Sequence, residues 1–381
     1  MKNRMLIGML GFGFMGRTHT YALKNIPLYF DSPRVEINLI AACEILEERA
    51  RYALERIGYK WVTKNWKEVT KSDQIDIVDN CLPNYLHCEP IIDAMENGKD
   101  VVCEKPLACS LKEAEEMMKA AKKHDAKNMI IFNYRFIPAL ILAKKLIDDG
   151  FLGRIFHFRG LYGHSRLVDP KGAHWIDTNR GEEMEWRLKN VYSGGGALTD
   201  LGTHLFDLAR YFVGPVSNLV AVTDTFIKER PKPRGGFETV DVDDAGSILL
   251  RFQNGAIGVV EASRLATGMI DELRFEIQGS KGALRFNLMD FNTLELFSRE
   301  DDKRIQGFRK ITVDAPPPAS WPPPKSTKGW ARAHVGILHH FIDCAVNDRK
   351  PKPDFEDGVE VQKILAATYV SCRDGKWVNL A

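Results

Sequence analysis

The sequence lacks the cysteine and charge patterns that mark several specialised classes of protein. Its seven cysteines form no Cys-x-x-Cys pair, the spacing typical of zinc and dithiol redox sites. Four of them lie in or beside apolar runs, where cysteine behaves as a small hydrophobe, so we expect reduced thiols. Lys and Arg total 53 against 51 Asp and Glu, and the basic residues are scattered. A net charge of +2 without a basic stripe argues against a nucleic-acid partner.

Long hydrophobic runs are also missing. No apolar run reaches the roughly 18 residues that a membrane-spanning helix needs. The first segment, "MKNRMLIGMLGFGFMG", has the basic start and apolar run of a secretory signal, but no small-residue cleavage site follows and polar "RTHTYALKN" comes next. We therefore expect a buried strand there, no membrane partner and a cytoplasmic location.

The length of 381 residues, 44% of them hydrophobic, favours two domains that each bury a core. Residues 1–135 alternate short apolar runs with amphipathic ones, which indicates a parallel sheet covered by helices on both faces. One of these helices begins after Ser110, with Glu113 placed to complete a capping box. The expected strands are "MLIGMLG", "INLIAACE", "IDIVDNCL", "DVVCEKP" and "NMIIFNYR".

The pattern changes in the expected second domain, 136–381. A helix, "IPALILAKKLIDDG", precedes a strand, "RIFHFRGLYGH", and several longer strands with glycine turns follow between residues 216 and 299. Consecutive strands with short turns indicate an antiparallel or mixed sheet. Residues 315–327 are dense in proline and are expected to form an extended surface loop before two closing helices, around 334–346 and 359–372.

A dinucleotide site is expected at the first turn. Gly11, Gly13 and Gly16 follow the first strand with the spacing Gly-x-Gly-x-x-Gly, which brings a helix N-terminus to a pyrophosphate. Phe12, Phe14 and Met15 complete this loop.

Glu44 ends the second strand, where a carboxylate accepts hydrogen bonds from a ribose and repels a 2′-phosphate, so NAD is favoured. Residues 26–36 are interpreted as an inserted loop that lengthens the usual spacing. A solvated Glu44, or NADP held by Arg49 and Arg51, are the alternatives.

The ends of two further strands carry polar side chains on the edge where open α/β sheets bind ligands. Lys105 would lie beside the nicotinamide half of a cofactor, where an ammonium group can donate to a substrate oxygen. A surface lysine paired with Glu104 is the alternative. The residues at these ends are Leu82, Pro83, Asn84, His87, Glu104 and Lys105.

The segment "GGGALTDLGTH" places an acid and a base one helical turn apart. Asp200 and His204 are spaced i and i+4, so both side chains can address one ligand, or simply brace the helix. A metal site is the other alternative, because His334, His339 and His340 cluster further on. Adjacent histidines face different sides of a helix, so no metal is expected.

Four motifs taken together resemble the Gfo/Idh/MocA family of oxidoreductases. They are "GFGFMGRTH", "PNYLH", "EKP" and "GGGALTDLGTHLFDLARYFVG", in the family's order over essentially the whole chain. The resemblance implies a Rossmann domain followed by an α+β domain with a large open, mainly antiparallel sheet. It also implies NAD(P)-dependent hydride transfer at a secondary alcohol or ketone of a sugar, anhydrosugar or cyclic polyol, and a homodimer or homotetramer formed through those sheets.

The same resemblance assigns residues to roles. It implies that Lys105 polarises the substrate oxygen, that His204 is the acid/base and that Asp200 positions both. Trp186 and Arg187 are similar to a pair that borders the nicotinamide in some members. The segment that begins "FNYRFIPAL" looks most like the levoglucosan dehydrogenase branch and suggests Tyr134 as a substrate contact.

Two other functions stay open within the family. One is a glycosidase that oxidises its substrate transiently, and the other is a dinucleotide-binding regulator without activity. A regulator would be expected to lack the lysine or the histidine, and both are present here.

Overall fold

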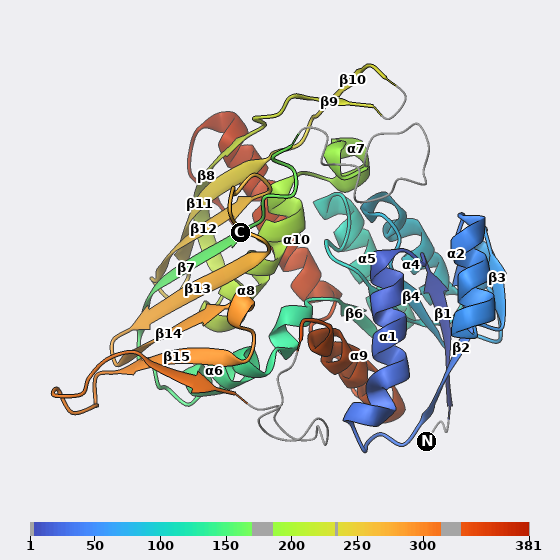
Figure 1. Ribbon diagram of the computed structural model, residues 1–381, viewed down its shortest axis with the longest axis horizontal. Helices are drawn as coiled ribbons and strands as arrows, with labels where there is room; N and C mark the ends of the chain where they lie inside the picture. Colours follow the sequence, from blue (N-terminus) through green and yellow to red (C-terminus); the bar gives the residue numbers. More distant parts are fainter. Residues whose placement is uncertain (1–3, 170–185, 233–234, 314–328, 381) are drawn as a thin grey trace. The chain divides into compact units, whose positions relative to one another are not determined.

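The computed structural model describes residues 4–169, 186–232, 235–313 and 329–380 (Figure 1). The described chain divides into two compact units. The first contains residues 4–136 and 329–362, and the second contains residues 137–313 and 363–380. The predicted proline-rich segment, 315–327, lies outside the described residues.

The first unit is built on a six-stranded sheet in which every pair of neighbours is parallel. The strand order is β3-β2-β1-β4-β5-β6, which is the Rossmann order. Strand β1 shows why the sheet is buried on both faces, because six of its seven residues are buried or half-buried. The strands are β1 (Arg4–Leu10), β2 (Glu36–Cys43), β3 (Trp61–Thr63), β4 (Ile77–Asn80), β5 (Asp100–Cys103) and β6 (Asn128–Ile130).

Helices cover this sheet as the amphipathic pattern predicted. The capping box on α5 is present, with the Ser110 hydroxyl accepting from the Glu113 N–H and the Glu113 carboxylate accepting from the Ser110 N–H. The helices are α1 (Phe14–Tyr29), α2 (Glu47–Tyr52), α3 (Trp66–Thr70), α4 (Cys88–Glu96), α5 (Leu111–His124) and α9 (Ala331–Val346). Because α1 continues to Tyr29, the predicted loop at 26–36 is helical over its first four residues, with Pro27 in the last turn.

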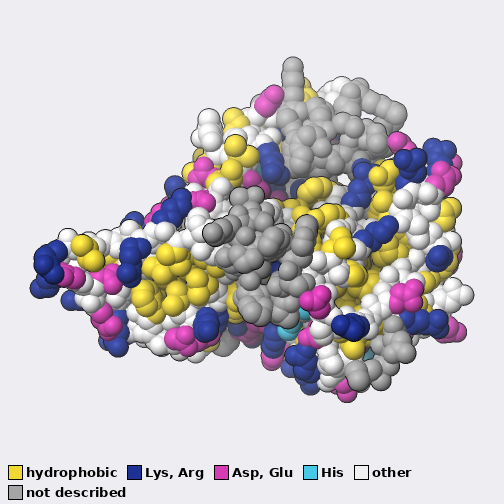
Figure 2. Space-filling view, turned by 60° about the horizontal axis from the view of Figure 1, so that its bottom comes forward, with side chains coloured by type: hydrophobic (Ala, Val, Ile, Leu, Met, Phe, Trp, Pro, Cys, Tyr) yellow, Lys and Arg dark blue, Asp and Glu magenta, His cyan; other side chains and the backbone are white. Residues whose placement is uncertain are grey.

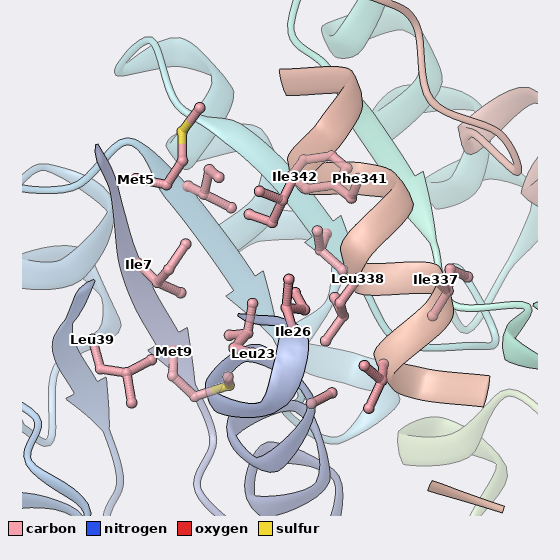
Figure 3. Packing of buried hydrophobic residues seen from close by; sticks show 14 of the residues in the cluster. Met5, Ile7, Met9, Leu23, Ile26, Leu39, Ile337, Leu338, Phe341 and Ile342 are labelled. Atoms are coloured by element: carbon pink, nitrogen blue, oxygen red, sulfur yellow. The ribbon is translucent and has the colours of Figure 1, made fainter. Parts of the chain in front are cut away.

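Helix α9 belongs to the first unit although it comes almost 200 residues after that unit's first segment ends. Figure 3 shows Leu338 and Ile342 of α9 facing side chains of β1 and α1. Ile337 and Phe341 belong to the same buried cluster. The predicted second domain, 136–381, therefore differs from the observed unit. The second unit begins after Phe136, 329–362 belongs to the first unit, and α10 (Phe355–Asp374) crosses from one unit to the other after Gln362.

The second unit contains the predicted large sheet, with nine strands in the order β16-β15-β14-β13-β7-β12-β11-β8-β17. Only β7 and β12 pair in parallel, and the other neighbours are antiparallel. The strands are β7 (Ile155–Gly163), β8 (Val216–Asp224), β11 (Ala245–Phe252), β12 (Ile257–Ser263), β13 (Glu272–Gly279), β14 (Gly282–Asn287), β15 (Thr293–Ser298), β16 (Arg309–Thr312) and β17 (Val378–Asn379).

One face of the nine-stranded sheet is buried and the other is open. In β11, buried and exposed residues alternate along the strand, as expected for a sheet with one covered face. Two short strands, β9 (Glu229–Pro231) and β10 (Phe237–Thr239), form a separate hairpin. The helices of this unit are α6 (Pro138–Asp148), α7 (Asn190–Ser193) and α8 (Thr203–Val213), with the second part of α10. The predicted fold class is confirmed.

The surface fits the composition. On the face shown in Figure 2, basic and acidic side chains are interspersed over the described residues. Among the helices that the structure describes, none combines the length and the apolar character that a bilayer-spanning segment requires.

Candidate active site

The glycine loop between β1 and α1 leaves room for a phosphate at the helix N-terminus. The N-cap residue of α1, Gly13, has no side chain to accept from the first N–H groups, which also have no acceptor within the helix. A Cβ on Gly16 would lie 2.0 Å from the Gly11 carbonyl oxygen, so Gly16 is required for packing. A Cβ on Gly13 would meet only Arg49 Nη1, at 3.6 Å, so Gly13 leaves space instead. This division of roles fits a bound pyrophosphate.

Glu44 is fixed beside this loop. Its residue exposure is 6%, and its two carboxylate oxygens accept the N–H groups of Phe12 at 3.1 Å and Leu46 at 2.9 Å. Each oxygen keeps a second acceptor position, so the carboxylate can still accept from a ribose hydroxyl. The alternative of a solvated side chain does not describe Glu44, because the group is buried and anchored.

The segments after β4 and β5 are tied to each other by His87. Its Nδ1 lies 2.9 Å from the Pro106 carbonyl oxygen and its Nε2 lies 2.9 Å from that of Leu82. The ring is fully buried, and this burial lowers the pKa of His87. Asn84 is also buried, in a short 3-10 turn that follows Pro83. His87 thus braces the loops, and a direct contact between His87 and the cofactor stays a prediction.

Lys105 lies in the segment after β5 that His87 contacts, directly before Pro106. It is half-buried two residues past the end of β5, and its main-chain N–H donates to Glu104 Oε2 at 3.0 Å. The other Glu104 oxygen lies 3.1 Å from His19 Nε2. Glu104 is therefore a buried anchor of the turn, and its carboxylate also interacts with the charge of Lys105.

His19 is a site residue that the sequence prediction did not single out. It has no exposed surface, and its Nδ1 lies 2.9 Å from Asp79 Oδ1. Burial alone would lower its pKa, but the Asp79 carboxylate outweighs this effect, and the pKa of His19 rises well above its usual range. Burial acts to raise the pKa of Glu104, yet its contact with His19 lowers it to about 2. The signal in the sequence was a histidine three positions after Gly16.

In the second unit, Asp243 sets where the predicted acid–base helix begins. Its carboxylate accepts the N–H of Gly196 at 2.8 Å and that of Leu198 at 2.9 Å. A Cβ on Gly196 would lie 1.8 Å from the Asp243 carbonyl oxygen, so only glycine permits this approach. The glycines of this motif thus serve the packing of the turn.

Asp200 and His204 lie on the helical segment that follows. Asp200 is within a π-helical turn, Leu198–Gly202, which leads into α8, where His204 is buried with its ring 5.8 Å from that of Tyr162. The Asp200 side chain keeps 28% of its surface exposed, and its Oδ2 accepts from Arg264 Nη2 at 3.3 Å.

Arg264 links this pair to the predicted Trp-Arg segment. Its Nη1 donates to the Arg187 carbonyl oxygen at 3.1 Å, and the Arg187 guanidinium lies 4.2 Å from the centre of the Trp186 ring. The buried Arg264 therefore connects Asp200 with Arg187, a link that sequence reasoning missed. His164, two residues after Tyr162, is also buried, and this burial lowers its pKa to about 4.

The predicted site residues fall into two groups. The glycine loop, Glu44, the ends of β4 and β5 and Tyr134, which is buried in a short turn, belong to the first unit. Trp186, Arg187, Asp200 and His204 belong to the second. A common site that joins Lys105 with Asp200 and His204 stays a prediction.

Known proteins match the chain over nearly all of its length. A family model described as an oxidoreductase family with an NAD-binding Rossmann fold matches residues 5–132, and the GFO/IDH/MocA C-terminal domain matches residues 140–285. Levoglucosan dehydrogenase of Pseudarthrobacter phenanthrenivorans is 35% identical, over 98% of this chain and 97% of the relative. D-apiose dehydrogenase of Paraburkholderia graminis is 27% identical, over 98% and 88%.

Solved structures agree with the family models. Levoglucosan dehydrogenase in complex with NADH and L-sorbose superposes with a TM-score of 0.93 at 35% identity, and covers 100% of both chains. The complex of the same enzyme with NADH and levoglucosan gives a TM-score of 0.92 over 99% of each chain.

The fold and the matching family models define a nicotinamide-dependent oxidoreductase. The chain belongs to the Gfo/Idh/MocA oxidoreductase family, whose first domain is an NAD-binding Rossmann fold. The predicted family, enzyme class and NAD cofactor are thus confirmed.

Proposed function

We propose that this enzyme transfers a hydride between NAD and a secondary alcohol or ketone of a sugar, anhydrosugar or cyclic polyol. The observation that carries the proposal is the setting of Lys105. Its turn is held by a buried Glu104 and by the His87 brace, on the same sheet edge as Glu44 and the glycine loop. A lysine held at this edge is placed to interact with a substrate at a bound nicotinamide. A lysine that only increased solubility would not need this support.

The protein's own groups divide the acid–base work in this proposal. The nicotinamide supplies the hydride acceptor or donor. Lys105 donates a hydrogen bond to the substrate oxygen and stabilises negative charge that develops there. His204 removes the hydroxyl proton during oxidation and returns it during reduction, a task suited to an imidazole. Asp200, oriented by Arg264, positions the substrate and His204.

The substrate class is inferred from the relatives. Levoglucosan, D-apiose and myo-inositol are named as substrates of dehydrogenases that match this chain. All three are polyhydroxylated molecules, so we propose a sugar, anhydrosugar or cyclic polyol. Trp186, Arg187 and Tyr134 are proposed to contribute to binding at the nicotinamide and the substrate.

A homodimer or homotetramer formed through the open face of the nine-stranded sheet is part of the proposal. Val222, Leu249 and Ile257 are exposed on three neighbouring strands and lie on one face by their pairing register. Exposed apolar side chains grouped on one face are typical of interfaces. Leu249→Glu should lower the mass measured by light scattering, whereas a monomeric wild type would contradict this part.

We also propose a cytoplasmic location, because the cysteines are free thiols. Two of the seven cysteines, Cys43 and Cys103, are buried at the ends of parallel strands, and the structure has all seven as free cysteines. Cell fractionation tests this location.

The activity is tested with a panel of sugars, anhydrosugars and inositols, offered with NAD⁺ or NADP⁺ while the reduced cofactor is followed by absorbance. Wild type should turn over at least one member, and Lys105→Met should lower kcat/KM by about 10²–10³-fold because one donor to the developing charge is lost. Lys99→Met is the matched control, since Lys99 precedes the other end of β5 and donates to the Ser72 carbonyl oxygen.

Three outcomes would count against the proposal. They are the absence of turnover with the whole panel while NADH still binds, release of a free sugar without net reduction of NAD, and full activity of Lys105→Met. The first favours a regulator and the second a glycosidase.

A further inference from the structure

A buried cluster of charged groups lies between the cofactor-binding helix and Lys105. His19, on the second turn of α1, contacts Asp79 of β4 through Nδ1 and Glu104 after β5 through Nε2. All three residues are buried, with exposures of 0%, 1% and 6%. Three elements of the first unit therefore meet at one imidazole ring.

The cluster requires a positive charge at its centre. A carboxylate only accepts hydrogen bonds, so each His19 nitrogen must carry a proton to donate to its partner. A neutral imidazole has one N–H, so one of its two contacts with these carboxylates would have no proton to donate. Two unneutralised carboxylates in such a place would repel each other and carry a large desolvation cost.

The other titratable groups around His19 do not supply that charge. Burial raises the pKa of the Cys81 thiol and of the Tyr59 hydroxyl, and lowers the pKa of His334 to about 3, so all three are neutral near neutral pH. Trp330 covers His334, with ring centres 4.3 Å apart. The groups that face His19 are Asp79 and Cys81 of β4 and its end, Tyr59 before β3, Glu104 after β5 and His334 of α9.

A metal ion is a poorer occupant of this cluster. The donor atoms of His19, Glu104 and His334 do lie within 4.8 Å of one another, as do those of His19, Asp79 and Cys81. However, Nδ1 and Nε2 point away from each other and each meets a different carboxylate at hydrogen-bond distance. One ion cannot replace both contacts.

We propose that His19 is a positioning residue for Lys105: as a buried imidazolium it holds Glu104, and Glu104 in turn holds the main chain of Lys105. The hydrogen bond that the Lys105 N–H donates to Glu104 Oε2 is the last of these contacts. Because His19 is part of α1, the helix that receives the pyrophosphate and the strand end that presents Lys105 are fixed to each other. This inference rests on the proposed function of Lys105.

The test uses His19→Gln in the full-length enzyme. Gln fills much of the same space and keeps a hydrogen-bonding end but carries no charge. We expect kcat to fall about 10- to 100-fold, because small displacements of a reacting group have effects of that size, while the Kd for NADH changes much less. His339→Gln is the matched control, since His339 is a buried histidine of the same unit whose Nε2 lies 2.6 Å from a carbonyl oxygen, that of Ser32.

A double variant separates positioning by charge from simple packing. In His19→Gln, Asp79 and Glu104 are left as two buried carboxylates. Asp79→Asn removes one of them, so His19→Gln/Asp79→Asn should recover part of the lost kcat. If His19 only fills space, the second substitution should lower kcat further, and that result would overturn the proposal.

Protonation is measured without any substrate. Nuclear magnetic resonance of the enzyme labelled with ¹⁵N-histidine, with His19 assigned by its loss in His19→Gln, should show both ring nitrogens protonated above neutral pH. A neutral His19, or a metal ion that co-purifies and binds it, overturns the inference even if wild type oxidises sugars. An imidazolium at His19 together with unchanged kcat in His19→Gln also overturns it. Failure of the wild type on the whole sugar panel would instead remove the proposed function.

Discussion

We propose that the Glu44 carboxylate decides whether NAD or NADP is preferred. Its oxygens are already oriented by the N–H groups of Phe12 and Leu46, so a ribose diol meets an acceptor that needs no rearrangement. A 2′-phosphate would bring like charges together at the same place. The glycine loop precedes the end of β2 in the sequence. This is the order expected of a Rossmann unit.

Glu44→Gln should reduce the preference for NAD. The amide keeps one acceptor oxygen but loses the charge and one anchor, so we expect the ratio of the Kd values for NADPH and NADH to fall about tenfold, equivalent to about 1.4 kcal/mol. Titration of protein fluorescence with each reduced cofactor measures it. Glu47→Gln, an exposed position with the same change of charge, is the control. An unchanged ratio would remove Glu44 as the determinant.

The positions of single residues were predictable where the local sequence pattern of a strand determined them. Gly11, Glu44 and Lys105 follow strands directly, so their placement on one sheet edge came from the strand pattern. His19 and Arg264 were not predictable in the same way, because their carboxylate partners lie 60 and 64 residues away. A pairing across that distance depends on the fold and leaves no periodic signal.

At the scale of elements, α9 completes the hydrophobic core of the first unit. Its apolar face was visible in the sequence, but the pattern does not say which domain that face covers. The π-helical turn before α8 was likewise missed, since the sequence predicted an ordinary helix through Asp200. Its start depends on Asp243, which lies far along the chain.

Phe341→Ala tests the role of α9. Phe341 is 1% exposed within the cluster of Figure 3, so its truncation should lower the free energy of unfolding by about 3–5 kcal/mol. Denaturant titration measures the loss, and NADH should restore part of the stability by binding the folded form. Phe156→Ala, at a phenylalanine of β7 that is 42% exposed, should cost much less. Equal losses would show that α9 adds little to this core.

The whole molecule should have its greatest stability near neutral pH. His334 and His164 have pKa values lowered to about 3 and about 4 by burial, so the unfolded chain takes up their protons first, below about pH 6.5, and stability falls toward acid. The lowered pKa of Glu104, about 2, adds stability above its usual 4.5 that is lost in the same direction.

The shifted pKa of His19 changes the stability with pH in the opposite direction. Its raised pKa gives stability that is complete below 6.5 and is lost as pH rises through its value in the folded protein. Thermal unfolding at constant ionic strength should therefore show a Tm that declines on both sides. His19→Gln should lack the decline between about pH 6.5 and 9, below the pH at which the buried thiols, whose pKa values are raised from 9.0, begin to contribute. A Tm that is flat across this range, or an unchanged alkaline side in the variant, would contradict these assignments.

Direct hydride transfer is tested most sharply by isotope. A substrate from the sugar panel, deuterated at the carbon that is oxidised, is incubated with NAD⁺ and the enzyme, and the reduced cofactor is examined by mass spectrometry. We predict that one deuterium appears in the nicotinamide of NADH, and that Lys105→Met slows its appearance by the same factor as kcat/KM. Consumption of the sugar with no deuterium in the reduced cofactor, or with NAD⁺ unchanged, would contradict a dehydrogenase that works by hydride transfer.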